Sequence, residues 1–344
     1  MNAELRVDLA RLRANITAVQ DRLRPAELMM VVKDDAYGHG LEPVVDSALA
    51  VGVTWFGAFD VPTAVRTAAV TGSRARVFAW LTVGEDEIAA ALAAGIELGV
   101  GDADYLERIA RVAPAPAAVH LKIDTGLHRN GVRPEAWPAF VQRAAALEAA
   151  GRVRVAGIWS HIAEASDAED DVSRALFDTA VAAAHSAGLA PEVLHLAASA
   201  AGWARPEFRY DVVRVGAFCY GVRSAGGPDL DGIAPAAALV ARVEAVGADS
   251  VRIGVGALDG VPSTLGGRID VGTPAGAREL RAVGPVECVV ASWPGAAVGD
   301  EVTIFGPGTA GEGSATDLGE AIDTVGEEPL LRLSPLIPRA YENR

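Results

Sequence analysis

The feature that most constrains the fold is an alternation of short apolar runs and alanine-rich stretches up to residue 225. Eight runs rich in apolar and β-branched residues lie at 28–32, 55–59, 76–80, 96–100, 118–123, 153–159, 193–196 and 210–213. Stretches between them, such as 41–51, 61–70, 86–94, 134–150 and 172–187, have helical spacing of apolar residues. Strands that alternate with helices form parallel sheets. Eight such units predict a closed (β/α)8 barrel, with an open doubly wound sheet as the alternative.

No GxGxxG sequence opens a helix after the first of these runs, which argues against a dinucleotide-binding sheet. After Gly226 the character of the sequence changes to β-rich runs at 236–246, 251–255, 288–292 and 301–305, with one helical pattern at 317–325. We therefore expect an α/β protein with a (β/α)8 TIM barrel at residues 1–225 and a mostly β C-terminal domain at residues 232–344.

Composition excludes several classes of function. The formal net charge of −15 makes nucleic acid a poor partner, because an acidic surface repels phosphate backbones. The two cysteines, Cys219 and Cys288, lie far apart, and no Cys/His cluster suggests a metal site. The N-terminus has no signal-type apolar region, and no apolar stretch is long enough to cross a membrane. We expect a cytoplasmic protein with no membrane partner.

The run at residues 29–32 ends in Lys33, and a polar turn with Tyr37 and two glycines follows. In barrels and other parallel α/β folds, the carboxyl ends of the strands carry the chemistry. A lysine among apolar neighbours loses proton affinity and becomes a nucleophilic amine, as Schiff-base chemistry requires. Taken alone, Lys33 is equally well interpreted as a strand-end lysine that reaches solvent.

Further polar residues follow other predicted strands. Lys122 and Arg129 lie at the end of the run 118–123, His161 follows 153–159, Ser199 joins a strand to a helix, and Arg214 and Gly216 follow the last run. A serine at a helix N-terminus can hold an anion with its hydroxyl and backbone N–H groups, and Gly216 lets backbone approach a phosphate. Each has an ordinary structural explanation, but together they converge on one barrel mouth.

These segments resemble the alanine racemase family. The matching segments are VKDDAYGHG (32–40), KIDTGLHRNGV (122–132), WSHIA (159–163), HLAASAA (195–201) and DVVRVG (211–216). They occur in the family's order and extend over the whole first domain. The resemblance implies pyridoxal 5′-phosphate bound to the barrel, a small amino-acid substrate and a head-to-tail homodimer whose second domains reach the partner's cofactor.

The resemblance also implies residue roles. Lys33 would form the Schiff base and act as the base for the D enantiomer. Tyr37, Ser199, Gly216 and Ala217 would hold the phosphate, and Arg214 would face the pyridine nitrogen and disfavour its protonation. Arg129 would contact the phenolic oxygen. Lys122 matches a lysine that is carbamylated in many members and holds this arginine, and His161 would lie behind these groups.

The family's second base is a tyrosine in a segment such as VGYGDGYP, which serves the L enantiomer. This chain has IGVGALDGVP at residues 253–262, and the two ways of aligning it place Val255 or Ala257 at the tyrosine. No tyrosine occurs between Tyr220 and Tyr341. The other candidates for a surrogate base, Asp259, Glu287 and Cys288, have ordinary explanations as turn, surface and core residues. The resemblance therefore holds for the cofactor residues and fails at the second-domain base.

Other family positions also differ. Cys288-Val289 replaces a Met-Asp pair that holds substrate-carboxylate contacts, Ala198 replaces an asparagine, and Pro335 stands at a polar or aromatic phosphate-contacting position. We expect an amino-acid racemase with weakened or altered activity. One alternative is one-base chemistry on Lys33, such as aldol cleavage, decarboxylation or transamination; Arg214 counts against the last. Another is a non-catalytic cofactor- or amino-acid-binding subunit, in a heterodimer with an intact racemase.

Overall fold

The computed structural model describes residues 2–82 and 84–343. These residues form two eight-stranded sheets. Val19–Lys33 and Ala48–Gly216 form one compact unit, and the remaining described segments form the other. Residues 34–47 and the N-terminal segment group with the second unit.

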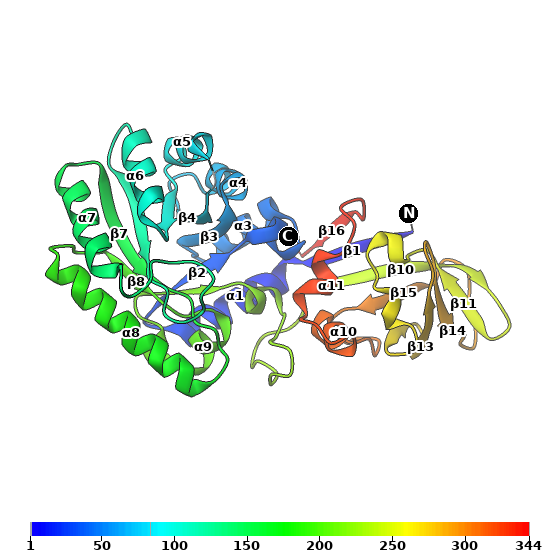
Figure 1. Cartoon of the computed structure of the whole chain (residues 1–344). Coiled ribbons are helices and arrows are strands. Elements are labelled where there is room, and N and C mark those ends of the chain that lie inside the picture. Colours follow the sequence, from blue (N-terminus) through cyan, green and yellow to red (C-terminus); the bar gives the residue numbers. More distant parts are fainter. Residues whose placement is uncertain (1, 83, 344) are drawn as a thin grey trace. The chain divides into compact units, whose positions relative to one another are not determined.

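The first unit contains a closed parallel barrel (Figure 1, blue to green). Its strands are β2 (Glu27–Val31), β3 (Trp55–Asp60), β4 (Arg76–Leu81), β5 (Glu97–Val100), β6 (Ala117–Lys122), β7 (Val153–Trp159), β8 (Val193–His195) and β9 (Val212–Val215). They pair in parallel in the order β8-β7-β6-β5-β4-β3-β2-β9. Backbone hydrogen bonds from Asp211 to Leu194 (3.1 Å) and from Arg214 to Ala197 (3.3 Å) bring β9 against β8. The predicted eight strands and barrel are confirmed.

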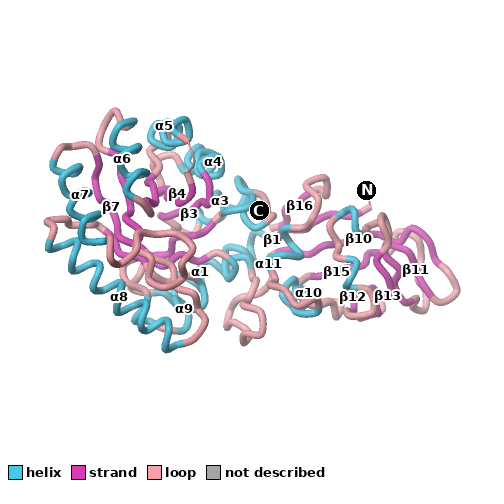
Figure 2. Tube along the Cα trace, in the orientation of Figure 1, coloured by secondary structure: helices cyan, strands magenta, loops and turns pink. Residues whose placement is uncertain are grey.

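Helices alternate with these strands. They include α4 (Val61–Thr71), α5 (Glu85–Ala93), α6 (Ala103–Val112), α7 (Trp137–Ala149), α8 (Asp167–Ser186) and α9 (Ser199–Ala204), followed by η1 (Pro206–Phe208). Figure 2 shows the helices α4 to α8 outside the barrel strands. Side-chain caps explain where two of them begin, because Asp60 accepts from the Thr63 amide and Asp102 from the Tyr105 amide, each at 2.7 Å. Within the described residues, no helix combines the length and apolarity needed to cross a membrane.

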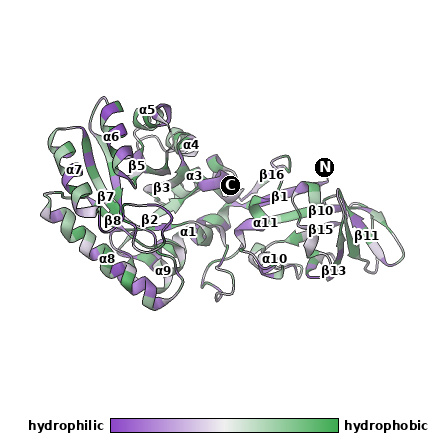
Figure 3. Cartoon of the chain, viewed as in Figure 1, coloured by the Kyte–Doolittle hydropathy of each residue, from purple (hydrophilic) through white to green (hydrophobic). Residues whose placement is uncertain are grey.

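The barrel interior combines apolar and polar side chains. Met29, Trp55, Phe78, Trp159 and Val212 form a buried cluster, and the hydropathy colouring in Figure 3 shows how apolar residues dominate the barrel strands. Charged or imidazole side chains are also buried among the strands, including Glu97, His120, His195 and Arg214. Barrel interiors are usually filled by branched apolar residues. Polar groups buried there are costly unless they are hydrogen-bonded, and these four side chains are hydrogen-bonded to one another.

The second unit is built around a mixed sheet. Its strands are β1 (Ala3–Asp8), β10 (Ala237–Val246), β11 (Ser250–Ile253), β12 (Asp270–Thr273), β13 (Gly276–Val283), β14 (Cys288–Ala291), β15 (Glu301–Phe305) and β16 (Arg339–Glu342). The order is β11-β14-β13-β12-β15-β10-β1-β16. The N-terminal strand β1 thus pairs antiparallel with β10 and parallel with β16. The expected fold class, a (β/α)8 barrel with a mostly β C-terminal domain, is confirmed.

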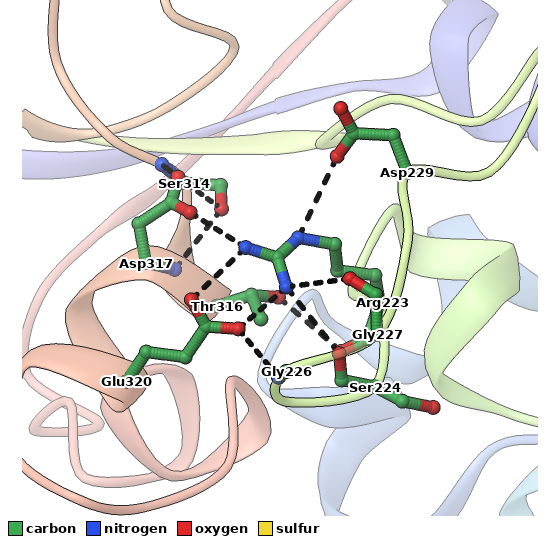
Figure 4. A network of polar contacts seen from close by, with 9 residues as sticks. All are labelled: Arg223, Ser224, Gly226, Gly227, Asp229, Ser314, Thr316, Asp317 and Glu320. Carbon is green, nitrogen blue, oxygen red and sulfur yellow. Dashed lines mark hydrogen bonds and ion pairs between the residues drawn. The ribbon is translucent and has the colours of Figure 1, made fainter.

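Further helices lie between and beside these strands. These are α1 (Leu9–Leu23), α3 (Leu41–Ala50), η2 (Ala217–Tyr220), η3 (Ala257–Asp259), η4 (Ser263–Leu265), α10 (Ala315–Ala321) and α11 (Glu327–Leu331). Arg223 ties the segment after η2 to α10, as Figure 4 shows. Its guanidinium contacts Glu320 at 2.5 Å and Asp317 at 2.9 Å, and Glu320 also accepts from the Gly226 amide at 2.8 Å. This network ties the loop to α10.

Candidate active site

A left-handed turn follows β2 directly. Val32 donates its N–H to the Gly57 carbonyl at 2.9 Å, and the next residues form the short element α2 (Lys33–Tyr37). Asp34, Asp35, Ala36 and Tyr37 all have φ between 54° and 56°. Left-handed backbone costs a non-glycine residue roughly 1–2 kcal/mol, and such strain gathers at functional sites. The turn leaves Lys33 half-buried at the carboxyl end of β2.

Tyr37 is fixed by packing within its own unit. Its ring is 6% exposed and lies 4.8 Å from the ring of Tyr220, centre to centre. Burial raises the pKa of the Tyr37 phenol, so its O–H keeps its proton and can donate a hydrogen bond. The following Gly40 has φ +92°, and a Cβ there would lie 1.9 Å from the Tyr341 hydroxyl. The glycine is therefore required for this turn to pack.

Arg214 lies on β9 with its guanidinium buried inside the barrel mouth, 5% exposed. One terminal nitrogen donates to the His195 carbonyl (3.2 Å) and contacts His195 Nδ1 (3.0 Å). The other donates to the carbonyls of Ser160 (2.8 Å) and Leu196 (2.9 Å) and contacts His161 Nδ1 (3.1 Å). Burial lowers the pKa of Arg214 to about 9, so it is a cation at neutral pH. These contacts hold the guanidinium rigidly.

Lys122 ends β6 and is 4% exposed. Its ammonium nitrogen lies 4.4 Å from the centre of the Trp159 ring. Burial, together with the nearby cations of Arg214 and Arg129, lowers the pKa of Lys122 to about 7. A substantial fraction of Lys122 is therefore a neutral amine at physiological pH, because the side chain is buried and close to positive charge.

His161 follows β7, and its pKa is affected by the cations around the barrel mouth. Burial lowers its pKa to about 3, and the cations of Arg214, Arg129, Lys122 and Lys33 all act in the same direction. His161 is thus neutral and accepts a hydrogen bond from Arg214. Four cationic side chains gathered around one neutral imidazole fit an anionic ligand.

Arg129 lies in the loop between β6 and α7 and is exposed. Asp124 organises this loop, because its carboxylate accepts from the Gly126 and His128 amides (3.1 and 3.0 Å) and from Arg133 (2.9 Å). Burial opposes ionisation of Asp124, but these hydrogen bonds lower its pKa to about 2. The structure brings Arg129 close enough to act electrostatically on Lys122 and His161.

Ser199 and Gly216 lie at the ends of neighbouring strands. Ser199 is the first residue of α9, as its sequence position indicates, and its hydroxyl accepts from the Gly216 amide at 3.3 Å. Ala217 follows as the first residue of η2 and is buried. A hydroxyl and backbone amides of this kind can hold phosphate oxygens. The α9 amide of Ala201 donates to the Glu164 carboxylate at 2.9 Å, a contact that the sequence did not indicate.

The two positions proposed for the second base differ in environment. Val255 is fully buried, whereas Ala257 is exposed in η3. Cys288 is buried in β14, and burial raises the pKa of its thiol to about 12, so it stays protonated at neutral pH. Asp259 accepts from the Gly256 amide at 2.9 Å, which gives its carboxylate a structural role in the loop. These contacts weaken the case for Cys288 and Asp259 as surrogate bases.

The mouth of the barrel thus places amines at the strand ends beside a buried guanidinium. The sequence model for the alanine racemase N-terminal domain matches residues 7–224. Alanine racemase of Thermobifida fusca is 35% identical over 368 residues, covering 98% of each protein. That of Frankia casuarinae is 36% identical over 369 residues, covering 97% of this chain and 95% of the other. The crystal structure of alanine racemase from D-cycloserine-producing Streptomyces lavendulae superposes with a TM-score of 0.93 at 31% identity, covering 100% and 98% of the two chains.

The chain therefore belongs to the alanine racemase family. Enzymes of this family are amino-acid racemases that use pyridoxal 5′-phosphate and are typically homodimers. The residues of the barrel mouth fit that cofactor. Lys33 and Lys122 are the only lysines in the chain, and both lie at strand ends of one barrel among excess positive charge, which suits a phosphorylated aldehyde.

Proposed function

We propose that the protein is a pyridoxal 5′-phosphate-dependent alanine racemase-like isomerase that acts on a small amino acid through Lys33, with weakened or altered racemisation. The observation that carries the proposal is a difference between the barrel and the positions aligned with the second base. The barrel combines an amine with buried cations at its mouth, whereas Val255 and Ala257, the positions aligned with the second base, have no ionisable side chain. Racemisation by two opposed bases needs a proton acceptor on each face of the α-carbon.

In this proposal each barrel residue has a defined task. When bound, the cofactor supplies an electron sink that acidifies the α-proton of the amino acid. Lys33 binds the cofactor and moves the proton on one face. The Tyr37 and Ser199 hydroxyls and the backbone of Gly216 and Ala217 hold the phosphate.

The remaining side chains adjust charge. Arg214 would lie toward the pyridine nitrogen when the cofactor is bound, and its cation would disfavour protonation of the ring, which would limit the electron sink and side reactions. Arg129 would hold the phenolic oxygen, and Lys122 would support Arg129. His161, neutral because of its burial among cations, accepts from Arg214 and helps to hold it.

The absence of the second base and of the substrate-carboxylate contacts determines how much the rate of racemisation should fall. Removing a positioned acid or base typically costs ~10²–10⁴-fold in rate. Loss of the substrate-carboxylate contacts at Cys288-Val289 should add to this cost, although not additively. We therefore expect slow interconversion of L- and D-alanine.

The test is to restore the hydroxyl. The rate of L- to D-alanine conversion is measured for the wild type and for Val255→Tyr and Ala257→Tyr, with Val255→Phe and Ala257→Phe as matched controls that lack only the hydroxyl. We expect one tyrosine variant to gain roughly 10²-fold over its phenylalanine control. A fast wild-type rate that neither tyrosine variant increases would refute the proposal.

A heterodimer is the second candidate, favoured by the same difference. Family enzymes are typically homodimers, and we propose a head-to-tail arrangement in which the partner's second domain completes each site. An intact racemase subunit could then supply the missing tyrosine. To distinguish a homodimer from a heterodimer, the protein is mixed with a family racemase that keeps its tyrosine but whose own lysine base is mutated. Only a mixed dimer would regain activity.

A further inference from the structure

A continuous hydrogen-bonded chain runs through the barrel interior from its amino-terminal end to its mouth. At the start of β4 and β5, Arg76 binds the Glu97 carboxylate at 2.5 and 2.8 Å. Glu97 contacts His120 Nε2 at 2.6 Å, and His120 Nδ1 contacts His195 Nε2 at 2.9 Å. His195 Nδ1 then contacts Arg214 at 3.0 Å. The chain therefore connects a carboxylate at one end of the barrel to the guanidinium at the other.

The two ends of this chain fix the protons between them. Arg214 can only donate, so His195 Nδ1 must accept and His195 must carry its proton on Nε2. That proton is donated to His120 Nδ1, which leaves the His120 proton on Nε2, facing Glu97. Glu97 can only accept when ionised. With both rings neutral, no other arrangement satisfies all three contacts.

Ionisation states support this arrangement. Burial lowers the pKa of His120 and lowers that of His195 well below its usual range, so both rings are neutral. Burial opposes ionisation of Glu97, but hydrogen bonds from His120 and Arg76 lower its pKa to about 2. Glu97 is therefore the anion at the end of the chain, and hydrogen bonds in such chains polarise one another.

Packing holds the rings in place. Both histidines are fully buried. Trp159 stacks on His195 with ring centres 5.6 Å apart and planes at 7°, and Phe78 lies 4.7 Å from His120, centre to centre. Gly157 makes room for the chain, because a Cβ at that position would lie 2.3 Å from His120 Nδ1. The rings cannot turn over without displacing these neighbours.

We propose that Glu97 and His120 are positioning residues for Arg214, which hold His195 as a hydrogen-bond acceptor and so fix the orientation of the guanidinium. This inference rests on the cofactor-facing role of Arg214 proposed above. Neither Glu97 nor His120 would touch the cofactor. A buried polar chain is costly unless every member is hydrogen-bonded, and here each ring nitrogen has a partner, so the chain stabilises one arrangement only.

The first test uses the wild-type full-length protein, with and without pyridoxal 5′-phosphate. Imidazole ¹⁵N NMR shows which ring nitrogen carries the proton, with resonances assigned by His120→Gln and His195→Gln. We expect both rings to carry the proton on Nε2 from pH 6 to pH 8 in both samples. A proton on Nδ1 of either ring, or a charged ring, would overturn the proposal. Turnover is not needed, so failure of the racemase assignment would be distinguishable.

The second test removes the anchoring charge. In Glu97→Gln, which keeps the shape of the side chain, the uncharged amide no longer requires a proton on His120 Nε2, so we expect His120 to lose its exclusive Nε2–H form. Glu192→Gln is the matched control, because Glu192 also binds Arg76, at 3.1 Å, but has no contact with His120. This control should match the wild type. A His120 spectrum unchanged in folded Glu97→Gln would overturn the proposal; if that variant does not fold, the wild-type spectrum decides.

Discussion

The Lys122 ammonium nitrogen lies 4.4 Å from the centre of the Trp159 indole ring, at the carboxyl ends of β6 and β7. The indole face attracts a cation, yet burial and the guanidinium groups of Arg214 and Arg129 lower the pKa of Lys122 to about 7. Repulsion from the arginines and loss of hydration outweigh the attraction. A neutral amine held among cations is suited to reaction with carbon dioxide, which would convert it into an anion.

We predict that Lys122 forms a carbamate. The protein is equilibrated with ¹³C-bicarbonate and observed by ¹³C NMR, and the carbamate signal should grow from pH 6 to pH 8 as the amine loses its proton. Lys122→Met should lose this signal, and Lys33→Met should keep it. An equal signal in Lys122→Met would place the carbamate elsewhere, for example at the N-terminus.

Covalent attachment of the cofactor should depend on Lys33 alone. Because the chain has only two lysines, borohydride reduction after incubation with pyridoxal 5′-phosphate gives an unambiguous result by peptide mass spectrometry. We expect the adduct at Lys33 in the wild type and in Lys122→Met, and its loss in Lys33→Met. Equal labelling of Lys33→Met would show that the amine at the end of β2 is not the attachment site.

Replacement of Gly157 should destabilise the barrel. In Gly157→Ala the new methyl group would meet His120 Nδ1, and overpacking of this kind costs about 1–3 kcal/mol in the free energy of unfolding. Gly202→Ala is the control, because its methyl group would meet Val213 rather than His120 or the rings packed on it. Urea denaturation should show a loss in both variants, whereas only Gly157→Ala should change the His120 ¹⁵N spectrum. A Gly157→Ala protein as stable as the wild type would contradict this packing.

Stability should fall as the pH falls from 7 to 5. Burial lowers the pKa of His39 to about 4 and that of His161 to about 3, from 6.5 in the unfolded chain, so the unfolded state binds more protons in this range. Each such histidine contributes a slope of up to about 1.4 kcal/mol per pH unit below pH 6.5. Urea unfolding at pH 7, 6 and 5 measures this slope. A free energy of unfolding that stays constant or rises on acidification would contradict the buried neutral histidines.

Much of the barrel could be predicted because its strands are short, mostly apolar runs and its helices have clear apolar spacing. The pairing of β1 with β16 in the second sheet could not. β1 (Ala3–Asp8) and β16 (Arg339–Glu342) are short, and their pairing joins the two ends of the chain. A local pattern carries no information about a partner more than 300 residues away.

The sequence allowed us to predict which polar residues follow the barrel strands, but not how their side chains are arranged. The left-handed turn after Lys33 was not predicted, since Asp34 and Asp35 suit an ordinary turn and only packing imposes their φ values. Glu97 lies within the predicted apolar run 96–100, and an isolated carboxylate in such a run was the only sequence feature that pointed to a special role for it. Its role depends on contacts between three strands that only barrel closure brings together.

The most direct test of the central claim is α-proton exchange in D₂O, followed by NMR, with D-alanine and L-alanine offered separately. If Lys33 works and the opposite face has no base, deuterium should enter D-alanine slowly with retained configuration, and little should enter L-alanine. Rapid exchange of both enantiomers with inversion would contradict the account, because it would require a second base that Val255 and Ala257 cannot provide.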